Sequence, residues 1–182
     1  MRVLGIDIET TGLEQEKGHR IIEIAACLYD LDTEKLVGKY TQRINPKRAI
    51  DPAAQAVHGI SFSELSDCPT WEEVAPKVLK LMSVSDVIVA HNGIGFDLPF
   101  IAGELVRAGL SIPSVKVLDT MISGRWATPL GKFPKLQELC FACDVDYDEV
   151  KAHGALYDVQ VMMESFFVGF KKGFFELEKN CE

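Results

Sequence analysis

The fold expected of this sequence follows from residues 3–9, which read VLGIDIE. Their alternation and their β-branched side chains are typical of a strand. On such a strand Asp7 and Glu9 project from one face, while Ile6 and Ile8 point the other way, into a core. Two neighbouring carboxylates repel each other and lose hydration, which is sensible if a divalent cation lies between them. The alternative is an ordinary solvated strand edge, and this stretch alone leaves both interpretations open.

The segments around this strand predict an α/β fold. Further strands are expected at 20–30, 35–44, 86–91 and 115–118, with a hairpin at 32–34. Helices are expected at 52–58, 71–83, 97–108, 120–126, 134–142 and 152–170. This order is typical of a mixed sheet with helices on its faces. Since the chain contains no repeat and no linker, we expect one domain over residues 1–182, with a core at about 3–170 and a short C-terminal tail.

Composition and charge exclude several classes of protein. Of the 182 residues 47% are hydrophobic and 25% are charged, which excludes disordered and collagen-like chains. The net charge of −8 excludes a protein that coats nucleic acid through general basicity. Residues 35–50 and 120–137 nevertheless hold eight Lys and Arg and no acid. Each of these two basic stretches is either a solvated face or a contact surface.

The sequence also predicts the compartment. Its apolar runs are far shorter than the roughly 20 residues of a membrane-spanning helix, and Asp7 interrupts the N-terminal apolar stretch, unlike a signal peptide. Five cysteines without an export signal predict reduced thiols in a cytoplasm. Cys140 and Cys143 form a lone CxxC pair, which we interpret as two small residues on an amphipathic helix rather than a metal site.

Other polar residues lie at the ends of the expected elements. Asp97 follows the buried strand 86–91 and opens a helix, where it is either a helix N-cap or a residue of a ligand crevice. His153 and Asp158 lie at the start of the last helix, and a lone pair of this kind is more often structural. Taken together with Asp7 and Glu9, the acids form an all-oxygen set that suits Mg²⁺ or Mn²⁺ rather than zinc. Two such ions support in-line attack on a phosphodiester.

The same residues resemble a known family. Its three motifs are represented by DIETTG at 7–12, HNGIGFD at 91–97 and His153-x4-Asp158. This set resembles the DEDDh 3′–5′ exonucleases, which include the DnaQ-like proofreading subunits and exodeoxyribonuclease X. Weaker matches extend the resemblance over about residues 3–168, at RIIEIAA 20–26, AVHGI 56–60 and VLDT 117–120. The second motif has one residue more than the usual pattern.

The resemblance implies a fold, a reaction and a set of functional residues. The fold would be ribonuclease-H-like, with a five-stranded mixed sheet whose second strand is antiparallel. Four carboxylates would hold two divalent ions, Mg²⁺ or Mn²⁺, and His153 would act as the general base. The four metal ligands would be Asp7, Glu9, Asp97 and Asp158. The reaction would release nucleoside 5′-monophosphates from a 3′ end.

The resemblance also implies substrate contacts. Leu13 would wedge against the terminal base and Phe96 would stack on a base. The backbone at Thr10, with His58 and Asn92, would hold the terminal nucleotide. The expected substrate-binding set is Thr10, Leu13, Val57, His58, Asn92 and Phe96. Phe96 and Val57 are alternatively plain core residues.

Substrate and partners are less closely defined by the sequence. We expect DNA 3′ ends, most of all single strands, with RNA trimming by an exoribonuclease or oligoribonuclease as the alternative, and a non-catalytic nucleic-acid-binding relative as a weaker one. Proofreading subunits usually continue into a tail that binds the polymerase, and the short tail here favours a free-standing nuclease. A polymerase partner or a homodimer stays open, and no membrane partner is expected. The phenylalanines between 166 and 175 are interpreted as core, with a dimer face as the alternative.

Overall fold

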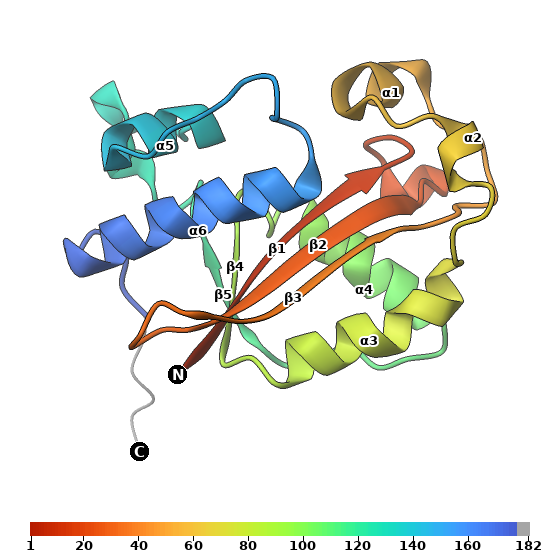
Figure 1. Ribbon diagram of the computed structural model, residues 1–182, viewed down its shortest axis with the longest axis horizontal. Coiled ribbons are helices and arrows are strands. Elements are labelled where there is room, and N and C mark those ends of the chain that lie inside the picture. The colour runs from red at the N-terminus through yellow and green to blue at the C-terminus, as the bar shows by residue number, and fades with distance from the viewer. Residues whose placement is uncertain (178–182) are drawn as a thin grey trace.

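Five strands form one mixed sheet in the computed structural model, which describes residues 1–177 (Figure 1). The order across the sheet is β3-β2-β1-β4-β5. Both β1 and β3 pair antiparallel with β2, whereas β4 pairs parallel with β1 and with β5. The strands are β1 (Arg2–Thr10), β2 (Ile21–Asp30), β3 (Leu36–Arg43), β4 (Val87–Ala90) and β5 (Lys116–Asp119). The expected mixed sheet with an antiparallel second strand is therefore confirmed.

Helices cover both faces of this sheet, as predicted. On one face Leu4, Ile6 and Ile8 pack against Trp71 of α3 and Phe100 of α4. On the other face the cluster joins β1 and β2 to α5 and α6. The helices are α1 (Pro52–His58), α2 (Phe62–Leu65), α3 (Trp71–Ser83), α4 (Asp97–Arg107), α5 (Leu136–Cys143) and α6 (Ala155–Lys171). Because side chains alternate along β1, Asp7 and Glu9 share the face that α6 covers.

Helix α6 lies directly on β1 at Gly5. A Cβ atom built on Gly5 would meet Met163 Cγ at 2.6 Å and Val159 Cγ1 at 3.1 Å. Such distances are shorter than van der Waals contact, so a side chain at this position would push the helix outward. The absent side chain therefore sets how closely α6, which carries Asp158, approaches the strand that carries Asp7.

The predicted helix at 120–126 is wrong. Residues 120–124 form a turn, and only a 3-10 turn follows, at Arg125–Ala127. The buried Asp119 carboxylate accepts hydrogen bonds from the backbone N–H groups of Met121 and Ile122, and also from those of Asn92 and Ile94. These bonds fix the turn after β5 against the loop that follows β4. Helix α2, which the sequence did not predict, begins at a capping box formed by Ser61 and Glu64.

The C-terminal aromatic residues are mainly core, as interpreted. Phe166, Phe167 and Phe175 are buried, whereas Phe174 is half exposed and its ring lies 4.5 Å from that of Trp126. The thiols of α5 are also buried, and Ser165 of α6 donates a hydrogen bond to Cys140 Sγ. Burial raises the pKa of Cys140 to about 11, which disfavours the thiolate needed for redox or metal chemistry.

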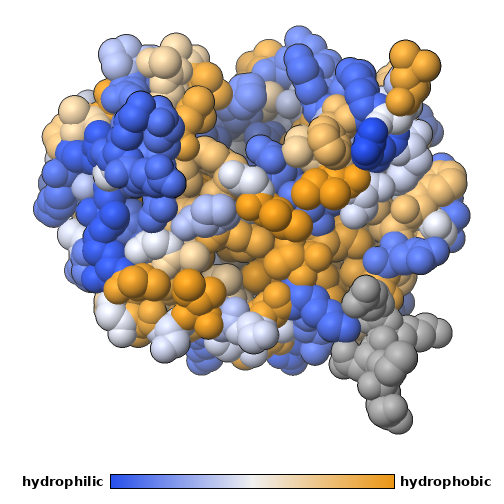
Figure 2. All heavy atoms as spheres, turned by 180° about the vertical axis from the view of Figure 1, so that it is seen from behind, coloured by the Kyte–Doolittle hydropathy of each residue, from blue (hydrophilic) through white to orange (hydrophobic). Residues whose placement is uncertain are grey.

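The opposite side of the molecule carries an apolar area. Figure 2 shows this face from behind, with hydrophobic side chains gathered near its centre. A hollow of about 370 Å³ opens between α4 and β5, lined in part by Ile94, Leu98, Ile112 and Val117.

Among residues 1–177, no helix combines the length and the apolar character that crossing a bilayer requires.

Candidate active site

Three carboxylates meet where β1 passes under the first turn of α6. Asp7 and Glu9 come from β1, and Asp158 comes from α6. One oxygen from each lies within 4.8 Å of the other two. Strand alternation places the first two on one face, and the packing of α6 at Gly5 brings the third beside them. The structure thus brings together three of the four metal ligands that the sequence predicted.

Asp97, the fourth, approaches from α4. It is not the helix N-cap considered as one reading of the sequence, because Phe96 occupies that position and Asp97 is the first helical residue. Its Oδ1 accepts a hydrogen bond of 3.1 Å from the Ile8 N–H, so the carboxylate is fixed to β1 between Asp7 and Glu9 in sequence. The side chain is buried, and its negative charge raises the pKa of Asp7.

Burial raises the pKa of all four carboxyls, and the charge of neighbouring acids adds to this effect for Asp7, Glu9 and Asp97. Desolvation is the largest cause for each, followed for Asp7 by the charge of Asp97 and for Glu9 by that of Asp158. The pKa of Asp7 lies well above its usual range, that of Glu9 rises to about 8 and that of Asp97 to about 7. A divalent cation would supply the positive charge that compensates such a cluster.

The geometry at Asp158 also fits a bound cation. Its Oδ2 accepts the backbone N–H of His153 at 3.1 Å, but its Oδ1 is buried with no hydrogen-bond partner among the described residues. A buried oxygen without a partner is costly in a folded protein. Since this oxygen belongs to the cluster of three carboxylates, an oxygen-preferring ion such as Mg²⁺ or Mn²⁺ fits the donor set.

His153 lies on the exposed turn just before α6. Its φ of 62° is left-handed, and this backbone conformation directs its N–H to Asp158. The imidazole lines a hollow of about 710 Å³ together with Asp158. The His153 charge lowers the pKa of Asp158, opposing the larger effect of burial. The side chains of His153 and Asp158 therefore face one common space.

Five of the six predicted substrate residues line one cavity. This hollow, the β1–α1 pocket, has a volume of about 440 Å³ and lies between the end of β1 and α1. Glu9 contributes to its wall, so the pocket opens onto the carboxylates. Leu13 and Val57 are 79% and 55% exposed, which places both at the surface rather than in the core. The five predicted residues are Thr10, Leu13, Val57, His58 and Phe96.

His58 brings a polar group to this pocket. Its Nδ1 accepts the Ile60 N–H at 3.0 Å, which fixes the ring. Its Nε2 is buried and makes no hydrogen bond to any described residue. Desolvation lowers the pKa of His58, with a smaller opposing effect of the Thr10 backbone. A neutral imidazole with an unpartnered nitrogen is suited to contact a polar ligand atom.

The sixth predicted residue, Asn92, lies in a different hollow from the other five. It lines the larger hollow beside His153 and Asp158, which we call the α6 groove. The physical reason is the Asp119 carboxylate, which accepts the Asn92 N–H at 3.0 Å and holds the residue at a φ of 62°. Phe96, four residues later, faces the β1–α1 pocket instead. The loop at 91–97 thus contributes to the walls of both hollows.

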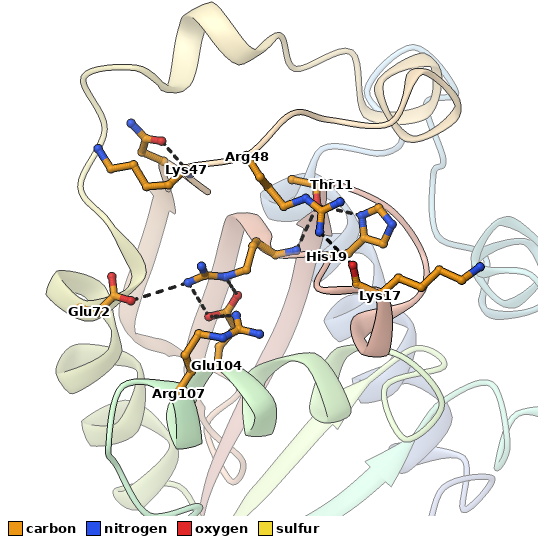
Figure 3. A network of polar contacts seen from close by, with 10 residues as sticks. Thr11, Lys17, His19, Lys47, Arg48, Glu72, Glu104 and Arg107 are labelled. Carbon is orange, nitrogen blue, oxygen red and sulfur yellow. Dashed lines mark hydrogen bonds and ion pairs between the residues drawn. The ribbon is translucent and has the colours of Figure 1, made fainter.

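Sequence reasoning missed His19 in the β1–α1 pocket and Glu23 beside the carboxylate cluster. His19 is buried and bonds to Thr11 Oγ1 at 3.0 Å (Figure 3). It also lies 3.4 Å from Asp51. A Cβ atom on Gly12 would lie 2.4 Å from the His19 ring, which explains the glycine of the first motif but could not be read from spacing. Glu23 pairs across the sheet with Glu9 and raises the pKa of Glu9.

A buried ion-pair network holds the loop between β1 and β2, which forms part of the pocket wall. Glu104 of α4 is 1% exposed and pairs with Arg20, whose Nη2 lies at 2.9 Å, and with Arg107 at 3.0 Å (Figure 3). Arg20 also approaches Glu72 of α3 at 3.7 Å. Since Arg20 directly follows His19, the network fixes the returning end of the loop that connects β1 to β2.

Comparisons with known proteins agree with this geometry. Residues 4–166 match the exonuclease family RNase_T. The DNA polymerase III subunit epsilon of Escherichia coli (strain K12) is 33% identical over 174 residues, which cover 91% of this chain and 70% of that protein.

Solved structures show the same fold. A structure of exonuclease X in complex with 5′ overhanging duplex DNA is 26% identical with a TM-score of 0.69, covering 94% of this chain and 93% of that one. A complex of E. coli ExoI with single-stranded DNA has 19% identity and a TM-score of 0.81. The match covers 94% of this chain but spans only 40% of the ExoI chain, so that similarity shows the fold alone.

Proposed function

The chain belongs to the exonuclease family, in its DEDDh 3′–5′ branch, and from this premise we propose that it hydrolyses the terminal phosphodiester at DNA 3′ ends, single strands above all, and releases nucleoside 5′-monophosphates. The observation that carries the proposal is the cluster of partly buried carboxylates, of which Glu9 also lines the β1–α1 pocket. The pocket supplies a place for one nucleoside, and the cluster supplies a place for the phosphate beside it.

Asp7, Glu9 and Asp158 would hold one divalent ion, and Asp97 would help to hold a second together with Asp7. When bound, the Mg²⁺ or Mn²⁺ ions would activate the attacking water and stabilise the leaving 3′-oxyanion. In this proposal the protein places four carboxylates around the phosphate before substrate arrives. The bond from Ile8 N–H to Asp97 and the unpartnered Asp158 Oδ1 support this ligand set.

His153 would take the proton of the attacking water. Its exposed turn borders the α6 groove, and its backbone bond to Asp158 fixes it next to a metal ligand. In the β1–α1 pocket, Leu13 and Phe96 would contact the terminal base, while Val57 closes the opposite wall. The His58 Nε2 and the Thr10 backbone would contact the sugar.

The assay of the proposal uses 3′-labelled and 5′-labelled strands of matched sequence as single-stranded DNA, duplex DNA and RNA, each with and without Mg²⁺. We expect Mg²⁺-dependent release of 5′-monophosphates from 3′ ends, fastest on single-stranded DNA. Faster cleavage of RNA would replace DNA by RNA as the substrate, and release from 5′ ends would contradict the proposal.

Phe96→Ala is expected to weaken substrate binding more than folding. Base stacking on an aromatic ring contributes about 1–3 kcal/mol, so the KM for single-stranded DNA should rise by roughly 5–150-fold. The ring also packs against Phe100, at 5.0 Å between centroids, so a modest loss of stability accompanies the change. Steady-state kinetics and thermal denaturation of the same preparation separate the two effects. A KM equal to that of the wild type would assign Phe96 to the core alone.

Divalent ions are expected to raise the melting temperature, and more so at higher pH. In the metal-free protein the carboxyls with raised pKa hold protons, and a cation must displace them. Their repulsion destabilises the fold increasingly as pH rises from the unfolded-state pKa of about 4 toward the folded values. For Glu9 and Asp97, with folded-state pKa values of about 8 and about 7, this loss of stability is complete only above neutral pH.

The measurement is the melting temperature with Mn²⁺, Mg²⁺ or EDTA at several pH values between about 6 and 9. An ion-induced rise that is equal at every pH would contradict the assignment of these carboxyls as ligands. The matched control is an exposed acid, Asp67→Asn, which should respond to ions as the wild type does.

We further propose that residues 1–182 act as one exonuclease domain with its core at 3–170. The names of the epsilon relatives as polymerase subunits support a test for a polymerase partner. Size-exclusion chromatography of the protein alone and with a polymerase would distinguish a monomer, a homodimer and a complex.

A further inference from the structure

The α6 groove lies on the other side of the carboxylate cluster from the β1–α1 pocket. Glu9 lines the pocket and Asp158 lines the groove, yet oxygens of these two residues lie within 4.8 Å of each other. In Figure 1 the start of α6 lies between α1 and α5. A ligand centred on the cluster can therefore extend into both.

We propose that the α6 groove is a second nucleic-acid subsite, which binds the nucleotides that precede the scissile phosphate. This inference rests on the proposed function. A phosphodiester has a nucleoside on each side, and the β1–α1 pocket accepts one of them. The rest of the strand must leave the cluster by another route, and the groove opens onto the same carboxylates.

The groove has the side chains that a single strand requires. Phe133 is 51% exposed and lines the groove, and the guanidinium carbon of Arg125 lies 5.0 Å from its ring centroid. Asn92 and Gln137 add amide groups to the wall. An aromatic face with adjacent cations is how proteins bind single-stranded nucleic acid without reading its sequence.

Charge distinguishes the groove from the pocket. The groove segment comes from the basic stretch 120–137, which holds Arg125, Lys132 and Lys135 and no acid. Lys132 pairs with Glu138, whereas Lys135 is exposed and lines the groove. The groove also contains Glu149, whose Oε1 accepts a hydrogen bond from Gln137 at 2.7 Å. A strand that continues upstream brings one phosphate per nucleotide, which the lysine would neutralise.

The groove wall is fixed relative to the catalytic carboxylates. His91 bonds through Nδ1 to Thr120 Oγ1 at 2.9 Å and through Nε2 to the Pro134 carbonyl at 3.1 Å. Pro134 lies between Phe133 and Lys135, and the loop that His91 begins leads into Asp97. The wall is thus positioned before substrate binds, as a subsite aligned with the cluster requires.

The test compares two substrates that differ in what they place in the groove. Thymidine 5′-monophosphate p-nitrophenyl ester offers one nucleotide and a small leaving group, whereas oligo(dT) strands of increasing length extend upstream. For the wild type, kcat/KM should rise with length until the groove is filled. In Phe133→Ala the ratio of kcat/KM for the long strand to that for the ester should fall by about 5–150-fold, the effect of one stacked base.

Lys135→Ala should reduce the salt dependence of binding. Its slope of log Kd against log salt for oligo(dT) should be smaller by about 0.7 than that of the wild type, because one phosphate contact is lost. The matched controls are Phe141→Ala, an 87% exposed ring on α5 outside the groove, and Lys80→Ala on α3. Both should keep the wild-type ratio and slope.

Two results would overturn the inference. One is a wild-type length dependence in both groove variants, and the other is an equal effect of the control variants. If the wild type hydrolyses neither substrate, the proposed function fails. The groove is then still tested by fluorescence anisotropy of labelled oligo(dT), where equal affinity of Phe133→Ala and the wild type would reject it.

Discussion

Asp7→Asn is expected to abolish Mg²⁺-dependent release of 3′ nucleotides while making the metal-free protein more stable. Asp7 contributes to both proposed ions, so the loss in kcat should exceed about 10³-fold, the upper range for removing a single charge-stabilising group. Stability should increase because the raised pKa of Asp7 means that its charged form is unfavourable in the fold. An uncharged amide of the same shape removes that cost, and each kcal/mol gained raises Tm by about 2–4 °C in a chain of this size.

Calorimetry in EDTA and a gel assay on a 3′-labelled strand measure the two effects on one preparation. The control, Asp67→Asn, removes an exposed acid and should change neither quantity. An Asp7→Asn protein that melts below the wild type in EDTA would mean that the carboxylates do not repel one another in the folded state. Retained activity would remove Asp7 from the reaction.

His153→Ala should lower kcat by about 10²–10⁴-fold, the contribution of a positioned general base. Metal binding should persist, because the bond to Asp158 comes from the backbone N–H rather than from the imidazole. Single-turnover kinetics on a labelled strand, together with the rise of Tm caused by Mn²⁺, measure the two properties separately.

His153→Asn provides the control for backbone conformation. The residue has a φ of 62°, which asparagine adopts more readily than alanine. If the imidazole acts as the base, both variants lose activity to a similar extent. If asparagine restores activity, the position matters for the turn and not for proton transfer.

Regular elements were predictable because their patterns are local. The alternation in VLGIDIE and the apolar run at 86–91 predicted strands within one residue of β1 and β4 at each end. The turn after β5 was not predictable, because Asp119 has the sequence signature of a local helix cap, whereas its carboxylate also bonds the distant loop after β4. Side-chain hydrogen bonds between segments that are far apart in sequence leave no periodic signal.

The residues of the candidate site also divide into those that local patterns predict and those that depend on contacts between distant segments. Asp7 and Glu9 were predictable from strand alternation, and the motifs identified Asp97, His153 and Asp158. The sequence could not show which of the two hollows each residue lines. Asn92 belongs to the α6 groove because its backbone N–H donates a hydrogen bond to the carboxylate of Asp119 at the end of β5. His19 reached the β1–α1 pocket through a loop whose packing depends on Gly12.

Gly5 carries no functional group, yet it controls whether the motif residues can work together. A methyl group there would collide with Met163 and move α6, and Asp158 would move with it, away from Asp7 and Glu9. A related sequence could therefore retain every signature carboxylate and histidine and still lack a usable metal site. Assigning activity to relatives of this chain requires reading the small residues under α6 as well as the acids beside it.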